Sequence, residues 1–263
     1  MLTPPSQGLR VVARGAPGDW AGACARAAAG GCVLKDHAGG TVWRATVLGR
    51  ECVLKCVPVR GPRRRIQSLL RISPAWRHWR NACWLRGRGI AAGEPLAIVE
   101  GRSGAASVEC LVVGYVSGAT VLAHAAGRDL PPRAEHRVAE AIAMVACRLA
   151  REGRKNRDPK PSNLVVMRAG ERAAELAVID CADLRRCARE NDAAIVRALA
   201  AAVLEPMGCG CAPRLALRAR AVREAAGRLE PADVRAAFRR LWRRIEAVVE
   251  AHGDPTPRDD PLA

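Results

Sequence analysis

The clearest pattern in the chain is an alternation of apolar and polar residues on either side of a glycine-containing turn. Residues 41–47 and 51–57 alternate, and residues 48–50 lie between them. Two alternating runs joined by a short glycine turn are typical of a β-hairpin. Residues 95–99 and 107–116 are two further apolar runs. The N-terminal part of the chain is therefore expected to form a small antiparallel sheet.

Helical spacing interrupts this pattern and later replaces it. Ser73 precedes Pro74, which is the arrangement of an N-cap residue and a first helical position. A helix is expected to run from there to the glycines near residue 87. Beyond residue 120, apolar positions recur every three or four residues, most clearly over 132–152 and 231–251. Both segments are predicted to be long amphipathic helices.

The change of periodicity near Ser117-Gly118-Ala119 predicts a boundary between two lobes. We expect a weakly structured lead-in over residues 1–30 with room for one short helix, a sheet-bearing N-terminal lobe over 31–117 and a helical C-terminal lobe over 118–263. The predicted fold class is α+β, because strands dominate one part and helices the other.

Composition adds a strong charge. The 263 residues include 43 basic and 26 acidic side chains, a net charge of +17, and 49% are apolar. Such a field favours polyanionic partners: nucleotides, nucleic acid, anionic lipid or phosphorylated glycan. No apolar run reaches the length of a membrane span, and the start of the chain lacks a signal-peptide pattern. The expected location is the cytoplasm, with peripheral contact at the inner membrane left open by the charge.

Eleven cysteines are spread along the chain. Most lie in apolar or alternating segments, where a free thiol behaves as a small core residue. A cytosolic chain of this length needs no disulfides. Cys209 and Cys211 form the one close pair, and a loop with two thiols is favoured there over a metal site.

The strongest chemical signal is the segment 157–163, which reads Arg-Asp-Pro-Lys-Pro-Ser-Asn and lies between a helix and a short apolar strand. Phosphoryl transfer needs a carboxylate to orient the attacking hydroxyl, a cation near the transferred phosphate and an oxygen ligand for magnesium. Asp158, Lys160 and Asn163 supply all three on one loop. The plainer alternative is a polar turn between helix and strand.

Two further residues extend this signal. Asp180 follows the apolar strand 176–179, and a carboxylate at the end of a buried strand is costly unless it is paired or binds a metal. Its plainer interpretation is an ordinary strand-ending Asp. Lys55 shares its strand face with Val53 and Val57, so this lysine lies on an apolar face where an anionic partner is expected.

Taken in order along the chain, these features resemble the lipopolysaccharide kinase (Kdo/WaaP) family, a divergent branch of the protein-kinase-like superfold. The resemblance runs from about residue 31 to residue 186. Its carriers are Val53-Leu54-Lys55, the segment 73–81, Gly89-Ile90, Glu94-Pro95-Leu96, the segment 156–163 and Val178-Ile179-Asp180.

The resemblance implies ATP and Mg2+ as cofactors and assigns roles to the motif residues. Lys55 would hold the ATP phosphates, and Asp158 would be the catalytic base. Asn163 and Asp180 would be the magnesium ligands. The implied acceptor is a hydroxyl, such as a sugar of lipopolysaccharide or another anionic membrane glycolipid.

The resemblance also implies how the nucleotide is enclosed. Tyr115 and Val116 would lie at the adenine hinge, and Gly39-Gly40 would mark the loop that covers the phosphates. The chain has no Gly-x-Gly-x-x-Gly pattern at that position.

Three departures from the family pattern stand out. Asn156 occupies the position of the usual catalytic-loop His, and Cys181-Ala182 replaces Phe-Gly after the metal-binding Asp. His78 stands where a helix Glu would pair with Lys55, and no carboxylate occurs between Glu51 and Glu94. The Lys–Glu pair of an active kinase therefore cannot come from that helix.

The sequence leaves three possible functions for the protein. The first is an ATP- and magnesium-dependent kinase acting on a hydroxyl. The second is a pseudokinase or nucleotide-binding scaffold, which His78 favours and Asp158, Asn163 and Asp180 oppose. The third is a basic nucleic-acid-binding protein, which the charge alone suggests.

Overall fold

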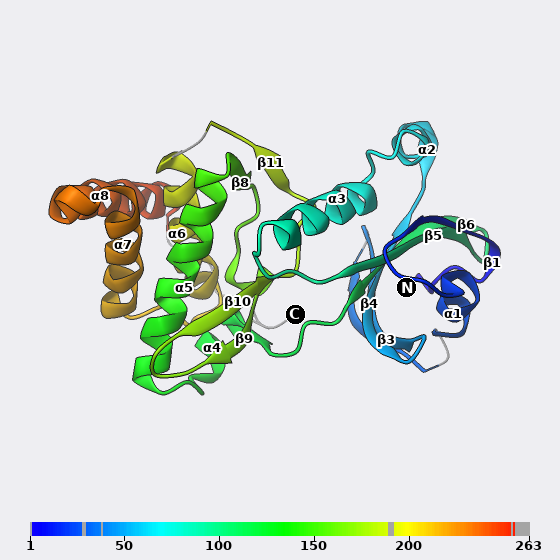
Figure 1. The fold of residues 1–263 in the computed structure, drawn as a ribbon, viewed down its shortest axis with the longest axis horizontal. Coiled ribbons are helices and arrows are strands. Elements are labelled where there is room, and N and C mark those ends of the chain that lie inside the picture. The colour runs from blue at the N-terminus through cyan, green and yellow to red at the C-terminus, as the bar shows by residue number, and fades with distance from the viewer. Residues whose placement is uncertain (1, 28–29, 38, 189–191, 254, 256–263) are drawn as a thin grey trace. The chain divides into compact units, whose positions relative to one another are not determined.

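The computed structural model describes residues 2–27, 30–37, 39–188, 192–253 and 255. It divides into two compact units, Met1–Val116 and Ser117–Ala263. Strands dominate the first unit and helices the second, so the α+β class expected from the sequence is confirmed. Figure 1 follows the elements along the chain.

The first unit is built on a six-stranded antiparallel sheet in the order β1-β5-β6-β4-β3-β2. Its strands are β1 (Gln7–Arg14), β2 (Cys32–His37), β3 (Gly40–Val47), β4 (Arg50–Pro58), β5 (Pro95–Ser103) and β6 (Ala106–Gly114). The hairpin predicted from the alternating pattern is β3–β4. Leu48 and Gly49 form its turn with φ angles of 51° and 73°, the left-handed pair that a two-residue hairpin turn requires.

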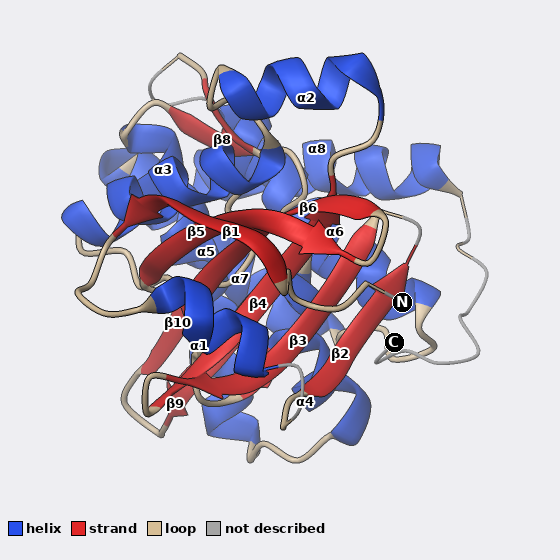
Figure 2. Ribbon diagram, turned by 90° about the vertical axis from the view of Figure 1, so that its right-hand side faces the viewer, coloured by secondary structure: helices blue, strands red, loops and turns tan. Residues whose placement is uncertain are grey.

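The two faces of this sheet are covered by different helices. On one face, Leu54 of β4 is buried in the same core as Trp20 of α1 (Trp20–Ala27). Figure 2 shows α1 lying across the strands. On the other face, Val53 packs into a cluster with Trp76 of α3 (Pro74–Gly87). Because side chains alternate along a strand, Lys55 shares the α3 side with Val53.

Helix α3 begins as the sequence predicts. The Ser73 hydroxyl oxygen accepts a hydrogen bond from the Trp76 backbone N–H at 3.4 Å, and Pro74 occupies the first turn. A separate helix, α2 (Gly61–Leu69), precedes it, and none of the α2 residues is buried.

The described part of residues 1–30 is more ordered than the expected lead-in, because it contains a strand as well as a short helix. Strand β1 pairs with β5 along the edge of the sheet, and α1 buries Trp20, Ala23 and Cys24. The strand has little apolar alternation of its own because an edge strand is held mainly by backbone hydrogen bonds. Helix α1 is the short helix for which the sequence left room, and its contact surface is made largely of small residues.

The second unit is mainly helical. Its helices are α4 (Val121–Gly127), α5 (Pro132–Arg151), α6 (Asp192–Gly208), α7 (Leu215–Leu229) and α8 (Val234–His252), with short 3₁₀ turns η1 (Pro161–Asn163) and η2 (Pro231–Asp233). Helices α5 and α8 are the two amphipathic helices predicted from spacing. Many contact positions are alanine, including Ala143, Ala225 and Ala237, all fully buried, so the helices approach closely.

Short strands complete the second unit. A three-stranded sheet has the order β10-β9-β7, from β7 (Ala119–Thr120), β9 (Leu164–Ala169) and β10 (Ala174–Val178). A further pair joins β8 (Arg154–Asn156) to β11 (Leu184–Arg186). All eleven cysteines are free thiols. Across the part of the chain that the structure describes, no helix is long and apolar enough to cross a membrane.

Candidate catalytic loop

The loop between β8 and β9 brings three of the predicted site residues into direct contact. The Asn163 side-chain Nδ2 donates to the backbone oxygen and to Oδ2 of Asp158, both at 3.1 Å. The Lys160 Nζ lies 3.1 Å from the other carboxylate oxygen, Oδ1. A single carboxylate is thus held between an amide and an ammonium group.

Local sequence explains this shape. The Asn156 Oδ1 accepts the Asp158 backbone N–H at 3.0 Å, an Asx turn that starts the loop. Asn163 N–H donates to Lys160 O at 2.9 Å, which closes η1. Pro159 and Pro161 fix φ on either side of Lys160. Asn156 therefore shapes the loop through its own side chain.

Asp180 comes next to this loop through strand pairing. Val178 of β10 is in register with Leu164 of β9, and the Ile179 N–H donates to Asn163 O at 3.0 Å. Asp180 is the next residue along, and its Oδ1 accepts from the Ala182 N–H at 3.2 Å. The carboxylate of the nearby Asp183 pairs with Arg185 at 3.0 Å.

Sequence reasoning missed one residue that supports the loop. Glu205 of α6 accepts two hydrogen bonds from Ser162, one from its N–H at 2.8 Å and one from its Oγ at 2.6 Å. Glu205 therefore anchors η1 to the helical core. The available signal was a lone acidic residue in the otherwise apolar stretch 198–208.

The loop offers oxygen ligands of the kind that Mg2+ prefers. Asn163 uses its amide NH2 on Asp158, so its carbonyl Oδ1 is the atom that could act as a metal ligand, and Asp180 could contribute a carboxylate oxygen. Within the described ranges no group of three or more His, Cys, Asp or Glu side chains could hold a metal. A metal here would therefore depend on mixed amide, carboxylate and nucleotide oxygens, and the residues present fit that arrangement.

The remaining predicted site residues belong to the first unit. Lys55 lies in β4, in register with Leu111 of β6. Tyr115 follows β6, where its N–H donates to Glu51 O at 2.9 Å and the Arg44 guanidinium lies 4.1 Å from the centre of its ring. Val116 is the last residue of the unit.

Gly39 and Gly40 lie where β2 turns into β3. Gly40 has a φ of +150°, and a Cβ added there would stand 2.4 Å from the Cys56 backbone oxygen. This glycine therefore permits the close approach of β3 to β4. The close packing of β3 against β4 is by itself a sufficient reason for a glycine at position 40. The role of Gly40 in covering the ATP phosphates therefore stays a prediction.

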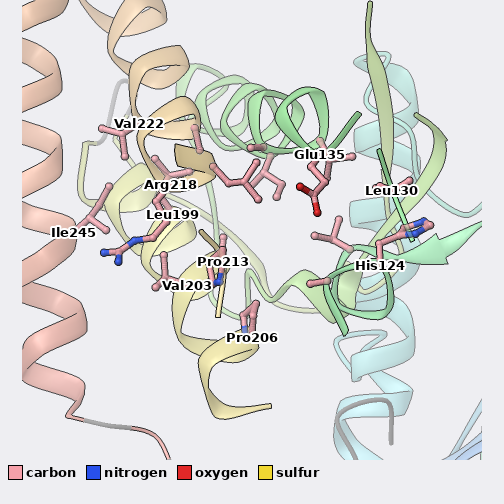
Figure 3. A pocket seen from close by; sticks show the side chains of 18 of the residues that line it. His124, Leu130, Glu135, Leu199, Val203, Pro206, Pro213, Arg218, Val222 and Ile245 are labelled. Carbon is pink, nitrogen blue, oxygen red and sulfur yellow. The ribbon is translucent and has the colours of Figure 1, made fainter. Parts of the chain in front are cut away.

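A separate cavity of about 100 Å3 opens in the helical unit, away from the loop residues. Its walls are apolar side chains of α4 to α8, such as Val138, Leu199 and Val222. Figure 3 shows Glu135 directing its carboxylate into this cavity. Arg218 also lines it and is paired with Glu246. None of Asp158, Asn163 and Asp180 borders it, so this cavity and the loop are distinct features.

The chain matches no known family model and no curated protein. The function is therefore inferred from the loop geometry and from the sequence resemblance.

Proposed function

We propose that the protein is an ATP- and magnesium-dependent phosphotransferase with a protein-kinase-like fold, acting on a hydroxyl acceptor. The observation that supports this most is the contact set of Asp158 with Asn163 and Lys160, on a loop tied by backbone hydrogen bonds to the strand before Asp180. These are the residue types and the order along the chain that phosphoryl transfer uses.

Asp158 acts as the base in this proposal. Its side chain is 44% exposed, so an acceptor hydroxyl can reach it, while Asn163 and Lys160 hold its orientation. As the hydroxyl oxygen bonds to the γ-phosphorus, Asp158 receives the hydroxyl proton and the bond to the β-phosphate oxygen breaks, releasing ADP.

Lys160 supplies positive charge next to the base. Its ammonium has three donors, one of which faces Asp158, and its side chain is 44% exposed. The others can meet oxygens of the transferred phosphate, where negative charge must be stabilised. Asn163 and Asp180 would hold magnesium, which screens the phosphate charge when bound.

The first unit would supply the nucleotide site. Lys55 lies on the α3 side of the sheet and would contact the ATP phosphates, with Tyr115 and Val116 along the adenine. The acceptor that fits the surplus of arginine best is a sugar of a lipid-linked anionic glycan, as the resemblance implies.

A second function has one specific observation in its favour. His78 is 3% exposed and no carboxylate occupies its helix, so α3 offers no partner of the usual kind to Lys55. A pseudokinase that binds ATP without consuming it would tolerate this. Nucleic-acid binding would explain the charge but not the ordered loop.

The experiment is an ATP-consumption assay with magnesium against lipid, glycan and protein acceptors, comparing wild type with Asp158→Asn. Transfer to any acceptor that disappears in a folded Asp158→Asn protein supports the kinase. ATP binding without consumption for every acceptor supports the pseudokinase. A folded protein that does not bind ATP contradicts both.

A further inference from the structure

Helix α2 exposes its apolar residues instead of burying them. None of its residues is buried, and Ile66, Leu69 and Leu70 are 54%, 76% and 63% exposed. Ile72, just beyond the helix, is 44% exposed. Surface helices normally turn such residues toward a core. A contiguous exposed group of this kind marks a contact site.

These side chains form one stripe. Ile66, Leu69 and Leu70 have the i, i+3, i+4 spacing that places residues on one side of a helix. Beyond the helix, the Ile72 N–H donates to Gln67 O at 2.8 Å. We call Ile66, Leu69 and Leu70 the α2 stripe.

Arginines border the stripe. At 100° per residue, Arg63 and Arg65 lie on its two flanks. No carboxylate occurs anywhere between Glu51 and Glu94, and no salt bridge joins either arginine to a residue that the structure describes. The apolar stripe therefore lies between two positive charges that have no ion-pair partner among the described residues.

The opposite side of α2 is fixed to the sheet. The Ser68 hydroxyl lies 3.0 Å from carboxylate oxygens of both Glu100 and Glu109. After the helix, Arg80 Nη2 donates to Arg71 O at 2.7 Å and Arg77 Nη1 donates to Ile72 O at 3.1 Å. Figure 1 shows α2 standing off the strands of its unit. The polar side is thus tethered and the stripe faces outward.

We propose that α2 attaches the protein to an anionic lipid bilayer. The stripe enters the boundary between head groups and acyl chains, while Arg63 and Arg65 meet lipid phosphates, as in other basic amphipathic helices at membrane interfaces. A nucleic acid would satisfy the arginines but would leave the stripe in water. This attachment needs neither ATP nor phosphoryl transfer, so its failure and that of the proposed function are separable.

The test is co-sedimentation of the full chain, without ATP, with vesicles of neutral phosphatidylcholine or of phosphatidylcholine containing phosphatidylserine. We expect binding to the anionic vesicles only, weakening steeply with salt because the charges are screened. Leu69→Gln with Leu70→Gln keeps every charge and should weaken binding by about tenfold or more. Arg63→Gln with Arg65→Gln should weaken it by about tenfold.

The matched control is Arg239→Gln with Arg243→Gln, which removes the same charge from exposed positions of α8 and should leave binding within about twofold. Arg64 is left intact because it interacts electrostatically with the buried Glu109. Unchanged melting temperatures show that the variants are folded. Any one of four results would overturn the proposal. Two concern the variants: an equal loss of binding in the α8 control, or wild-type binding by the Leu69/Leu70 variant. Two concern the wild type: equal binding to neutral vesicles, or binding to short duplex DNA but not to vesicles.

Discussion

At the residue scale, the buried carboxylate of Glu109 has an environment that favours its protonated form. Its side chain is 1% exposed, and burial raises its pKa, although hydrogen bonds from Ser73 and Ser68 partly oppose the shift. The Ser68 hydroxyl has one proton but lies 3.0 Å from oxygens of both Glu109 and Glu100. A proton on Glu109 removes that conflict, since the carboxyl group can then donate.

The pH dependence of stability should reveal this group. Because the folded pKa is raised, Glu109 stabilises the fold fully below its unfolded pKa, near 4.5, and loses that contribution as pH rises through the folded pKa. Glu109→Gln keeps the shape without the charge. We expect its melting temperature, relative to wild type, to increase between about pH 5 and pH 8. A constant difference across that interval in thermal unfolding would contradict this.

Substitutions at His78 distinguish an active kinase from a pseudokinase. An active kinase needs its strand lysine held in place by a helix carboxylate. In an active protein we expect His78→Glu to keep or raise turnover, because it supplies the missing charge to Lys55. His78→Gln, which is uncharged, should not. The gain should vanish with Lys55→Met, since the lysine is then absent.

Because His78 is 3% exposed, the folded state of each variant must be checked first by its melting temperature. A folded His78→Glu protein with turnover no better than that of His78→Gln would show that this helix position does not serve Lys55.

At the element scale, the candidate loop depends on a neighbouring helix. Glu205 of α6 accepts hydrogen bonds from both the N–H and the hydroxyl of Ser162. The position of the loop therefore depends on the hydrophobic core that holds α6. A hydrogen bond to a charged group contributes about 1.5–3 kcal/mol. In the proposed reaction Glu205 would touch no reacting atom and would act by positioning the loop.

Glu205→Ala should therefore lower both stability and turnover. We expect a loss of about 1.5–3 kcal/mol in the free energy of unfolding and a fall of roughly 10²-fold in kcat, because displacing a reacting group by about 1 Å has this cost. The KM for ATP should change little. Ser162→Ala keeps the N–H bond and should give a smaller loss of both. Wild-type kcat in a destabilised Glu205→Ala protein would remove Glu205 from the positioning role.

The elements that sequence could predict are those whose signal is local. The β3–β4 hairpin has alternation and a glycine turn, α3 has Ser73 and Pro74 at its start, and α5 has regular apolar spacing. The contacts of Asp158 with Lys160 and Asn163 are also local, because all three lie within one short loop.

The features that the sequence could not predict are formed by contacts between residues that are far apart along the chain. Strand β1 exists because β5 pairs with it across some ninety residues, and its own pattern is weak. Glu205 lies 43 residues from Ser162, and no spacing rule connects them. The exposed stripe of α2 was equally hidden, because helical spacing alone does not show which helices find a core.

At the scale of the whole molecule, the proposed chemistry assigns Lys55, Lys160 and Asp180 to the same bound nucleotide. Lys55 belongs to Met1–Val116, and Lys160 and Asp180 belong to Ser117–Ala263. Only the phosphates and metal of bound ATP link these groups in the proposal, so a reagent that carries a reactive group on the phosphates tests the whole arrangement.

An acyl phosphate of ATP is such a reagent: a lysine amine near the phosphates attacks its acyl carbon, forms an amide and releases ATP. The chain has four lysines, at positions 35, 55, 155 and 160. We expect labelling of Lys55 and Lys160, suppressed by excess ATP with magnesium and reduced in Asp180→Asn because magnesium is then poorly held. Lys35 and Lys155 are exposed and serve as internal controls for random acylation. Peptide mass spectrometry measures all four sites in one digest. Uniform labelling, or labelling of Lys160 without Lys55, would contradict the assignment of both lysines to the ATP phosphates. The proposed role of Asp158 as a base toward ATP would then lose its support.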